Sequence, residues 1–208
     1  MLVVGAGGFA KELLQVLEFN NEYKNIVFFD NVNEHNLVIG NKYTVLKNDE
    51  QCEEHFRNSD YSFSLGIGNG VIRHKLSSKF TLMNGVLISI ISKKAEIGNH
   101  VEIGEGATIL AGAIISNSAK IGRGLLMYYN AIITHDCEIG DFVELSPGAT
   151  ILGRVKIGNF TQVGANATVL PDIVIGNNTI IAAGAVVTKN VPDNCVAIGI
   201  PAKIIKKE

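Results

Sequence analysis

One histidine stands at a position where several of the surrounding sequence repeats place a short polar residue. His135 follows Ile133 by two residues, and the same place in other repeats holds Asn99, Asn159 and Asn177. An imidazole has an ordinary pKa of about 6.5, so it can accept a proton during catalysis near neutral pH. Because this position faces out of the repeat, we expect His135 on an outer edge and not in the core.

Two further residues complete the candidate chemistry around this histidine. Asp136 follows directly, and a carboxylate stabilises imidazolium, although a solvated turn aspartate is an equally good interpretation. Gly153 comes 18 residues after His135 and therefore stacks on it if the repeat closes every 18 residues. A glycine lets a ligand approach the backbone, and its N–H can polarise a carbonyl, or it simply suits the corner.

A second candidate site lies near the start of the chain, where glycines follow a short apolar run. The turn Gly5-Ala6-Gly7-Gly8 separates Leu2-Val3-Val4 from a predicted helix over Lys11–Phe19. Such a turn between strand and helix can cradle phosphate, although alone it is a weak signal. Asp30 ends a second predicted strand. Its carboxylate can accept from a ribose hydroxyl or a base N–H there, or it caps a helix or closes a strand-end turn.

The elements that carry these residues differ between the two halves of the chain. Predicted strands over 2–4, 26–29 and 61–67 alternate with helices over 11–19 and 69–80, which indicates a small parallel, Rossmann-like sheet. Every sixth residue from Ile97 to Val187 is apolar, at sixteen positions without an insertion. This period predicts a hexapeptide solenoid of triangular, 18-residue coils. We expect an α/β domain over residues 1–85 and an all-β parallel β-helix over 86–208.

Composition argues against several classes of function. The 18 basic and 20 acidic residues form no basic block, so nucleic acid is not the expected partner. No apolar run approaches ~18 residues and the first residues do not resemble a signal peptide, so we expect a cytoplasmic protein without a membrane span. Cys52, Cys137 and Cys195 form no metal pattern, and we expect no metal site.

Several motifs carry a family resemblance that spans essentially the whole chain. They are the hexapeptide units, Gly5-Ala6-Gly7-Gly8-Phe9, Ile67-Gly68-Asn69 followed by Arg73, Thr134-His135-Asp136-Cys137-Glu138-Ile139-Gly140-Asp141-Phe142, and Gly199-Ile200-Pro201-Ala202-Lys203. Together they resemble the NeuD/PglD family of bacterial sugar acetyltransferases, which have left-handed parallel β-helices. The resemblance implies acetyl-CoA as co-substrate with no bound cofactor, a nucleotide-linked amino sugar as acceptor, and a homotrimer with sites between subunits.

The resemblance also implies roles for individual residues. It makes His135 the general base of a direct transfer, with Asp136 raising its basicity. The 18-residue stacking adds Gly153, whose N–H we expect beside the thioester. Acetyl-CoA binding is expected at Glu144, Gly153, Ala165, Ala183, Lys189 and Lys203, and acceptor binding at Gly7, Gly8, Phe9, Asp30, Asn31, Gly68 and Tyr128. Phe9, Tyr128 and Glu144 depart from the residues that the family often carries, which leaves the identity of the acceptor open.

Other functions were weighed against this interpretation. O-acetylation of sialic acid or another sugar is the alternative within the enzyme class, and a non-catalytic trimeric scaffold is the second alternative. A nicotinamide-dependent oxidoreductase is disfavoured because about 85 residues are too few for two mononucleotide-binding halves. A γ-class carbonic anhydrase needs three converging histidines, whereas His100 and His135 stand at different positions of the repeat.

Overall fold

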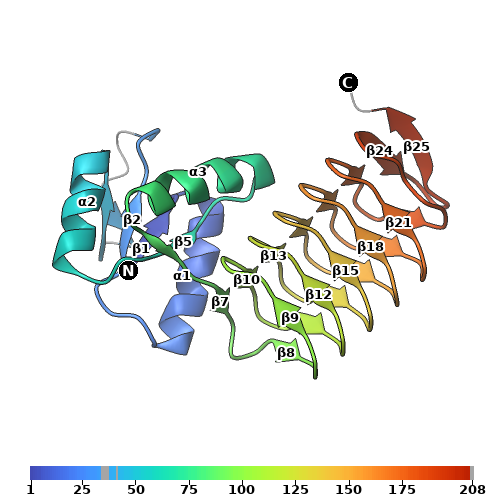
Figure 1. Ribbon diagram of the computed structural model, residues 1–208, viewed down its shortest axis with the longest axis horizontal. Helices are drawn as coiled ribbons and strands as arrows, with labels where there is room; N and C mark the ends of the chain where they lie inside the picture. Colours follow the sequence, from blue (N-terminus) through green and yellow to red (C-terminus); the bar gives the residue numbers. More distant parts are fainter. Residues whose placement is uncertain (34–37, 41, 207–208) are drawn as a thin grey trace. The chain divides into compact units, whose positions relative to one another are not determined.

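The computed structural model of this protein describes residues 1–33, 38–40 and 42–206, and it divides into two compact units. They are Met1–Ser92 and Lys93–Glu208 (Figure 1). The boundary lies seven residues beyond the predicted one at residue 85, because β6 (Val86–Leu87) still pairs with β5 (Ser62–Leu65). The side-chain amide of Asn20 also donates to the carbonyl of Ile91 at 2.7 Å, which ties β7 (Ile90–Ile91) to the first unit.

A six-stranded sheet forms the centre of the first unit, in the order β3-β4-β2-β1-β5-β6. Its remaining strands are β1 (Leu2–Val4), β2 (Val27–Phe29), β3 (Val38–Ile39) and β4 (Tyr43–Leu46). All neighbours are parallel except β3 and β4, which form an antiparallel pair. The sequence analysis predicted β1, β2 and β5, whereas β3, β4 and β6 are additional.

Three helices accompany this sheet: α1 (Gly8–Asn20), α2 (Asp49–Asn58) and α3 (Gly70–Leu82). The side chain of Asn48 accepts from the Gln51 N–H at the start of α2, and Asn69 accepts from the Ile72 N–H at the start of α3. In contrast, α1 begins after Gly7, which provides no side-chain cap. The residue at this N-cap position therefore accepts from none of the first N–H groups of α1 through a side chain.

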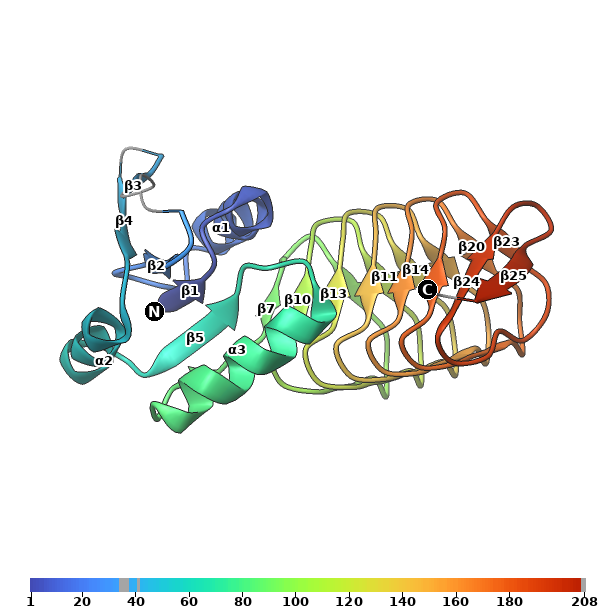
Figure 2. The same cartoon turned by 90° about the horizontal axis from the view of Figure 1, so that it is seen from above.

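The second unit is a parallel β-helix built from two-residue strands, and Figure 2 shows its coils stacked along one axis. We call its three sheets faces 1, 2 and 3, in the order in which each coil visits them. Face 1 contains β10 (Thr108–Ile109), β13 (Leu126–Met127), β16 (Glu144–Leu145), β19 (Gln162–Val163) and β22 (Ile180–Ile181). Face 2 contains β8 (Glu96–Ile97), β11 (Ile114–Ile115), β14 (Ile132–Ile133), β17 (Thr150–Ile151), β20 (Thr168–Val169) and β23 (Val186–Val187). Face 3 contains β9 (Glu102–Ile103), β12 (Lys120–Ile121), β15 (Glu138–Ile139), β18 (Lys156–Ile157) and β21 (Val174–Ile175).

The register of these sheets follows the 18-residue coil. Ile115, Ile133 and Ile151 are direct partners on face 2, and all three are buried. The small residue two positions earlier, such as Ala131 or Ala149, is fully buried as well. The repeat therefore predicts which side chains fill the interior, except in the first coil. There the isoleucine of β8, Ile97, is 39% exposed.

The β-helix ends in a hairpin outside the hexapeptide pattern. β24 (Cys195–Ile198) continues face 1 by pairing in parallel with β22, and β25 (Lys203–Lys206) returns antiparallel to β24. All four residues of β25 are exposed.

Candidate active site

The corners of the β-helix explain why position 135 is unusual. We name each edge after the two faces that it joins, so edge 2/3 joins face 2 to face 3. On edge 3/1 the Asp141 and Asn159 side chains each accept from a backbone N–H one coil earlier, at 2.8 and 2.7 Å. Edge 2/3 begins in the same way, since Asn117 accepts from the Asn99 N–H at 2.8 Å. His135 and then Gly153 occupy the next two places of this ladder and interrupt it.

His135 lies on edge 2/3 between β14 and β15, with 53% of its side chain exposed. Its Nδ1 is 2.7 Å from Oδ2 of Asp136. Asp136 has a left-handed backbone with φ of 59°, and from this conformation its carboxylate reaches the preceding side chain. A carboxylate at Nδ1 favours the tautomer that carries its proton there, so the lone pair lies on Nε2. This geometry leaves Nε2 free to accept a proton.

Gly153 stacks on His135 one coil later. A Cβ at this position would lie 2.7 Å from both Cε1 and Nε2 of the imidazole, so no other residue fits beneath the ring as it is placed. The ladder acceptor for the Gly153 N–H would come from residue 171, but that residue is Pro171, which has no side-chain acceptor. Among the described residues this N–H has no hydrogen-bond partner, so it can donate to a ligand.

Cys137, the nearest thiol to His135 in sequence, does not have the properties of a nucleophile. Its side chain is buried, and its Sγ donates to the carbonyl of Leu152 at 3.2 Å. Burial raises the pKa of this thiol, so the reactive thiolate is disfavoured at neutral pH. The residue therefore serves packing.

Apart from Gly153, the residues expected to bind the donor do not gather around His135 within one chain. Ala165 and Ala183 lie on edge 1/2, one face away from edge 2/3. Lys189 shares edge 2/3 but lies three coils further along, and Lys203 belongs to the terminal hairpin. Glu144 lies on face 1, where it accepts from the side-chain amide of Gln162 at 3.2 Å. The offsets of Ala165, Ala183 and Glu144 from His135 are not multiples of 18, so these three residues lie on another edge or face.

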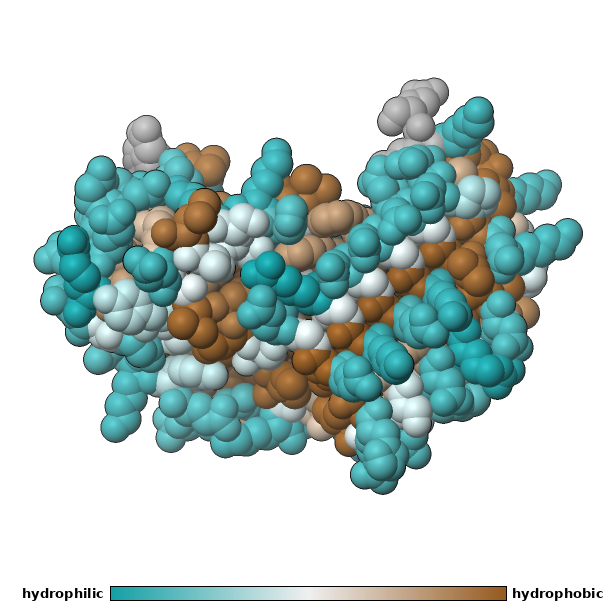
Figure 3. All heavy atoms as spheres, viewed as in Figure 1, coloured by the Kyte–Doolittle hydropathy of each residue, from teal (hydrophilic) through white to brown (hydrophobic). Residues whose placement is uncertain are grey.

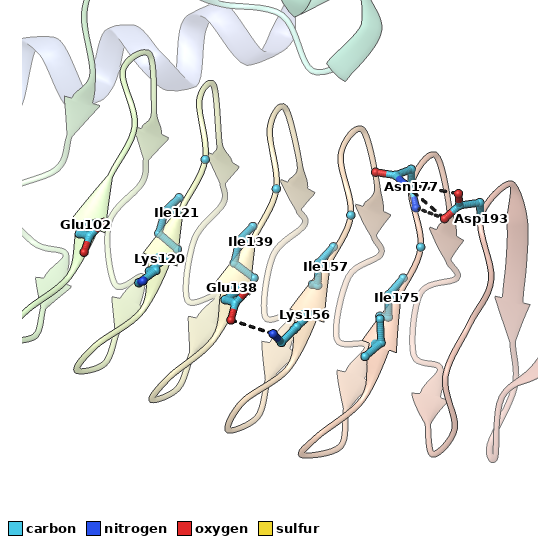
Figure 4. Close-up of a pocket in the computed structure, with 15 residues that line it drawn as sticks. Glu102, Lys120, Ile121, Glu138, Ile139, Lys156, Ile157, Ile175, Asn177 and Asp193 are labelled. Carbon is cyan, nitrogen blue, oxygen red and sulfur yellow. Dashed lines mark hydrogen bonds and ion pairs between the residues drawn. The ribbon is translucent and has the colours of Figure 1, made fainter.

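A shallow groove of about 590 Å³ runs along face 3, and His135 is not among its lining residues. Figure 4 shows its floor of isoleucines, and Figure 3 shows apolar, small and polar rows alternating on the β-helix. Four glycines, one residue after these isoleucines, leave the floor open: Gly122, Gly140, Gly158 and Gly176. Glu138 and Lys156 form an ion pair of 2.9 Å across it. The sequence analysis did not predict this groove.

In the first unit, the strand order places three candidate segments at one edge of the sheet. Gly7, Asp30 and Gly68 follow β1, β2 and β5, and these three parallel strands are neighbours. Gly7 and Gly8 are exposed, and a Cβ at either would meet no atom within 4 Å. Space is therefore open at the N-terminus of α1. The Gly68 carbonyl accepts from the guanidinium of the buried Arg73.

Asp30 is engaged by its own turn, the structural alternative that the sequence analysis left open. Its Oδ1 accepts from the N–H groups of Val32 and Asn33 at 2.9 and 3.1 Å, and Oδ2 accepts from the Asn33 amide at 2.7 Å. Burial raises the pKa of Asp30, but these hydrogen bonds and the Lys47 charge hold it below its usual value. Asn31, within the turn, is exposed.

Lys47 is a residue that the sequence analysis missed at this site. Its Nζ donates to the carbonyls of Asp30 and Asn33, at 3.0 and 2.7 Å, and so fixes both ends of the turn. It directly follows β4, and this strand was itself not predicted. Phe9, in the first turn of α1, and Tyr128, at the start of a corner on edge 1/2, are both half-buried.

The described part of the chain contains neither a candidate metal site nor a candidate membrane-spanning helix. No group of three or more His, Cys, Asp or Glu residues in that part of the chain is arranged to hold a metal ion. None of the helices in the described ranges is both long and apolar enough to cross a membrane.

Two family models match the two units. Residues 1–80 match the PglD N-terminal domain, and residues 154–189 match the bacterial transferase hexapeptide of six repeats. A comparison with the sequences of curated proteins finds no match.

Solved structures of sugar acetyltransferases match the chain over almost its whole length. PerB from Caulobacter crescentus, in complex with CoA and GDP-perosamine, is 29% identical over 98% of this chain and 96% of that chain, with a TM-score of 0.90. The acetyltransferase domain of PglB from Neisseria gonorrhoeae FA1090, in complex with acetyl coenzyme A, is 25% identical over 98% of both chains, with a TM-score of 0.89. WeeI from Acinetobacter baumannii AYE is 29% identical over 98% of both chains, with a TM-score of 0.88. The predicted fold class is confirmed, and the protein is an acyltransferase with a left-handed hexapeptide β-helix that is similar to sugar acetyltransferases over almost its whole length.

Proposed function

We propose that the protein transfers an acetyl group from acetyl-CoA to the amine of a nucleotide-linked amino sugar, with His135 as general base. The observation that carries the proposal is the exposed His135–Asp136 pair, which leaves Nε2 free above Gly153. PerB holds CoA together with GDP-perosamine, and the PglB domain holds acetyl coenzyme A, which supports this choice of substrates.

The geometry supports a direct transfer without an acyl-enzyme. The acceptor amine attacks the thioester carbonyl while Nε2 of His135 removes its proton, and the Asp136 carboxylate stabilises the resulting imidazolium. The Gly153 N–H donates to the oxyanion of the tetrahedral intermediate. When this intermediate collapses, the C–S bond breaks and imidazolium returns the proton to the leaving thiolate. The products are CoA and the N-acetylated sugar.

We assign the nucleotide of the acceptor to the first unit. The open Gly7 and Gly8 precede the uncapped N–H groups of α1, and a helix N-terminus favours phosphate. Asp30 supports this site through the turn that it holds, with Asn31 exposed beside it. The acceptor-site assignment also includes Phe9, Gly68 and Tyr128.

We assign acetyl-CoA to the β-helix and propose a homotrimer that completes its site. Ala165 and Ala183 line edge 1/2 with small side chains that suit a pantetheine arm, whereas His135 lies on edge 2/3. Two edges of one prism cannot close on a single thioester, so a second chain must bring its edge 1/2 to the first chain's edge 2/3. The positive charges of Lys189 and Lys203 can pair with the CoA phosphates. We also assign Glu144 to the acetyl-CoA site. This donor implies the cytoplasm as the compartment.

A thiol-release assay tests the proposed reaction. The purified protein is incubated with acetyl-CoA and, in turn, UDP-, dTDP- and GDP-linked amino sugars and free sialic acid. CoA release is followed with 5,5′-dithiobis-nitrobenzoate, and mass spectrometry identifies the product. We expect release with a nucleotide amino sugar and a product with an amide-linked acetyl group. Release with sialic acid alone would indicate O-acetylation, and no release together with no CoA binding would indicate a scaffold.

A further inference from the structure

Three charged residues form a column beside His135 on edge 2/3. Asp136, Arg154 and Asp172 are spaced 18 residues apart, and their φ angles are 59°, 62° and 63°. Equal backbone conformations direct the side chains alike, with one coil, roughly 4.8 Å, between neighbours. Arg154 therefore has one carboxylate on each side, in adjacent coils.

In the structure, Arg154 pairs with only one of these two carboxylates. Its Nε lies 2.6 Å from Oδ1 of Asp172 and an Nη lies 2.8 Å from Oδ2, which is the bidentate geometry that arginine favours. Hydrogen bonding to Asp172 raises the pKa of Arg154, and the Asp136 charge adds to the rise, so Asp136 lies within electrostatic reach. Asp136 instead directs Oδ2 to His135.

Few other charged groups face His135. The preceding corner on edge 2/3 offers Asn117 and Ser118, which are uncharged, and the following corners contribute Arg154 and Asp172. On the adjoining face 3, Glu138 and Lys156 are paired with each other. The balance of charge at His135 is thus set by which aspartate holds the Arg154 guanidinium.

We propose that Asp172 is a positioning residue, which holds the Arg154 guanidinium on its own side and so leaves the Asp136 carboxylate on His135. The inference rests on the proposed function, in which His135 is the base. Without Asp172, the guanidinium turns to Asp136 and competes with Nδ1 of His135 for its oxygens. The imidazole then loses both its orientation and the stabilisation of its charged form.

Three variants test this competition: Asp172→Ala, Arg154→Ala and the double variant. We expect Asp172→Ala to lower kcat about tenfold, which is only part of the roughly 10²–10⁴-fold that a positioned base contributes. The midpoint of its pH–rate profile should move to lower pH, because a carboxylate shared with arginine stabilises imidazolium less. Arg154→Ala should stay within about twofold of wild type, because it removes the competitor. The double variant should match Arg154→Ala, so that removing arginine rescues the loss of Asp172.

A matched control separates competition from the general loss of an ion pair. Glu138→Gln breaks the pair with Lys156, which has the same spacing of 18 residues and similar exposure, and it should leave kcat unchanged. Where His135→Asn is inactive, so that His135 is the base, three results would overturn the inference. They are an Asp172→Ala enzyme like wild type, a double variant as slow as Asp172→Ala, and an Arg154→Ala enzyme as slow as Asp172→Ala.

An NMR titration separates this inference from the identity of the base. The His135 imidazole signal is identified by its absence in His135→Asn, and its titration midpoint is compared among the same variants. A midpoint that falls in Asp172→Ala and recovers in the double variant supports the positioning role, even if the reaction rate does not follow. In that case it is the assignment of the base that fails. A midpoint that is the same in all variants refutes the positioning role whatever the rate does.

Discussion

At the scale of single residues, the ladder on edge 2/3 explains why the fold tolerates a histidine at position 135. In several other repeats this place holds an Asn or Asp whose Oδ1 accepts from a backbone N–H one coil earlier, as Asn117 does for Asn99. His135 gives up that hydrogen bond and instead reaches Asp136. The exchange loses about 1 kcal/mol of net stability, a typical value for one hydrogen bond. A polar corner has thereby gained a titratable group without disturbing the coil.

We predict that His135→Asn separates stability from activity. The introduced asparagine can accept from the Asn117 N–H, so the thermal midpoint should be unchanged or slightly higher. Loss of a positioned base should lower kcat about 10²–10⁴-fold and remove the rise of rate with pH near ~6.5. Both ligands should still bind, because asparagine fits this corner of the coil, as Asn117 does one coil earlier. A kcat within threefold of wild type would place the base elsewhere.

The turn after β2 leads to a prediction for the acceptor site. Asp30→Ala removes the acceptor of three hydrogen bonds, and Lys47→Ala releases the two carbonyls at the ends of the turn. Both changes should raise the acceptor KM and leave the KM for acetyl-CoA unchanged. If only the donor KM moves, the two ligands have been assigned to the wrong units.

The same turn has a defined pH dependence. The pKa of Asp30 is lower in the folded protein than its ordinary value near ~3.9, so its ionised form adds stability above that pH. This contribution is lost as pH falls through the folded-state pKa. The difference in unfolding free energy between wild type and Asp30→Asn should therefore be constant from about pH 5 to 7 and shrink below about pH 4. Urea unfolding at these pH values measures it.

At the scale of elements, two stacked phenylalanines on edge 3/1 adopt a backbone conformation that bulky residues rarely use. Phe142 and Phe160 have φ of 54° and 57°, and their rings stack 5.8 Å apart at 6°. Phe142 is 2% exposed and covers Gly124, where a Cβ would lie 2.5 Å from its ring. Phe160 is half-buried. The left-handed backbone is unfavourable for both phenylalanines, and burial of the Phe142 ring compensates this cost more than burial of the Phe160 ring does.

We predict unequal changes in stability when each phenylalanine is replaced by asparagine, a residue that tolerates the left-handed region. Phe142→Asn should lower the free energy of unfolding by about 3 kcal/mol, because a buried ring is lost. Phe160→Asn should change it by less than about 1 kcal/mol, since relief of strain offsets a smaller loss of burial. Urea denaturation of both variants gives the comparison. Equal destabilisation would show that the stack acts as one unit.

Strands and helices could be predicted from the sequence where buried residues recur at a regular spacing. The six-residue repeat fixed the strands, corners and interior of the β-helix, because every coil buries the same two positions. α2 was missed because it buries only Cys52 and Phe56, too few residues for a helical period, although its Asn48 cap was visible in the sequence. The same repeat also predicted the exposed position of His135. The turn at Asp30 could not be predicted in this way, because it depends on Lys47, which follows another strand.

At the scale of the whole molecule, one chain cannot form the proposed active site alone, because the alanines proposed to bind acetyl-CoA lie on a different edge from the histidine. Residue numbers modulo 18 assign Ala183 to edge 1/2 and His135 to edge 2/3, and this arithmetic was available from the sequence. Which edges of two chains come together depends on how a second copy docks, and no pattern within the sequence of one chain predicts that docking. A site shared between chains makes activity a property of pairs of subunits, and such sharing can be tested by mixing two inactive variants.

We predict that His135→Asn and Ala183→Trp complement each other. The first lacks the base, and the second fills the proposed pantetheine groove on edge 1/2, so each homotrimer should be nearly inactive. In trimers co-assembled from equal amounts, a site works when one chain supplies His135 and its neighbour supplies Ala183. The probability is one half times one half, so about a quarter of wild-type activity should return. Native mass spectrometry verifies mixed assembly. If mixed trimers form but stay inactive, or if an active monomer of 22.3 kDa is found, each site lies within one chain and the shared-site scheme is wrong.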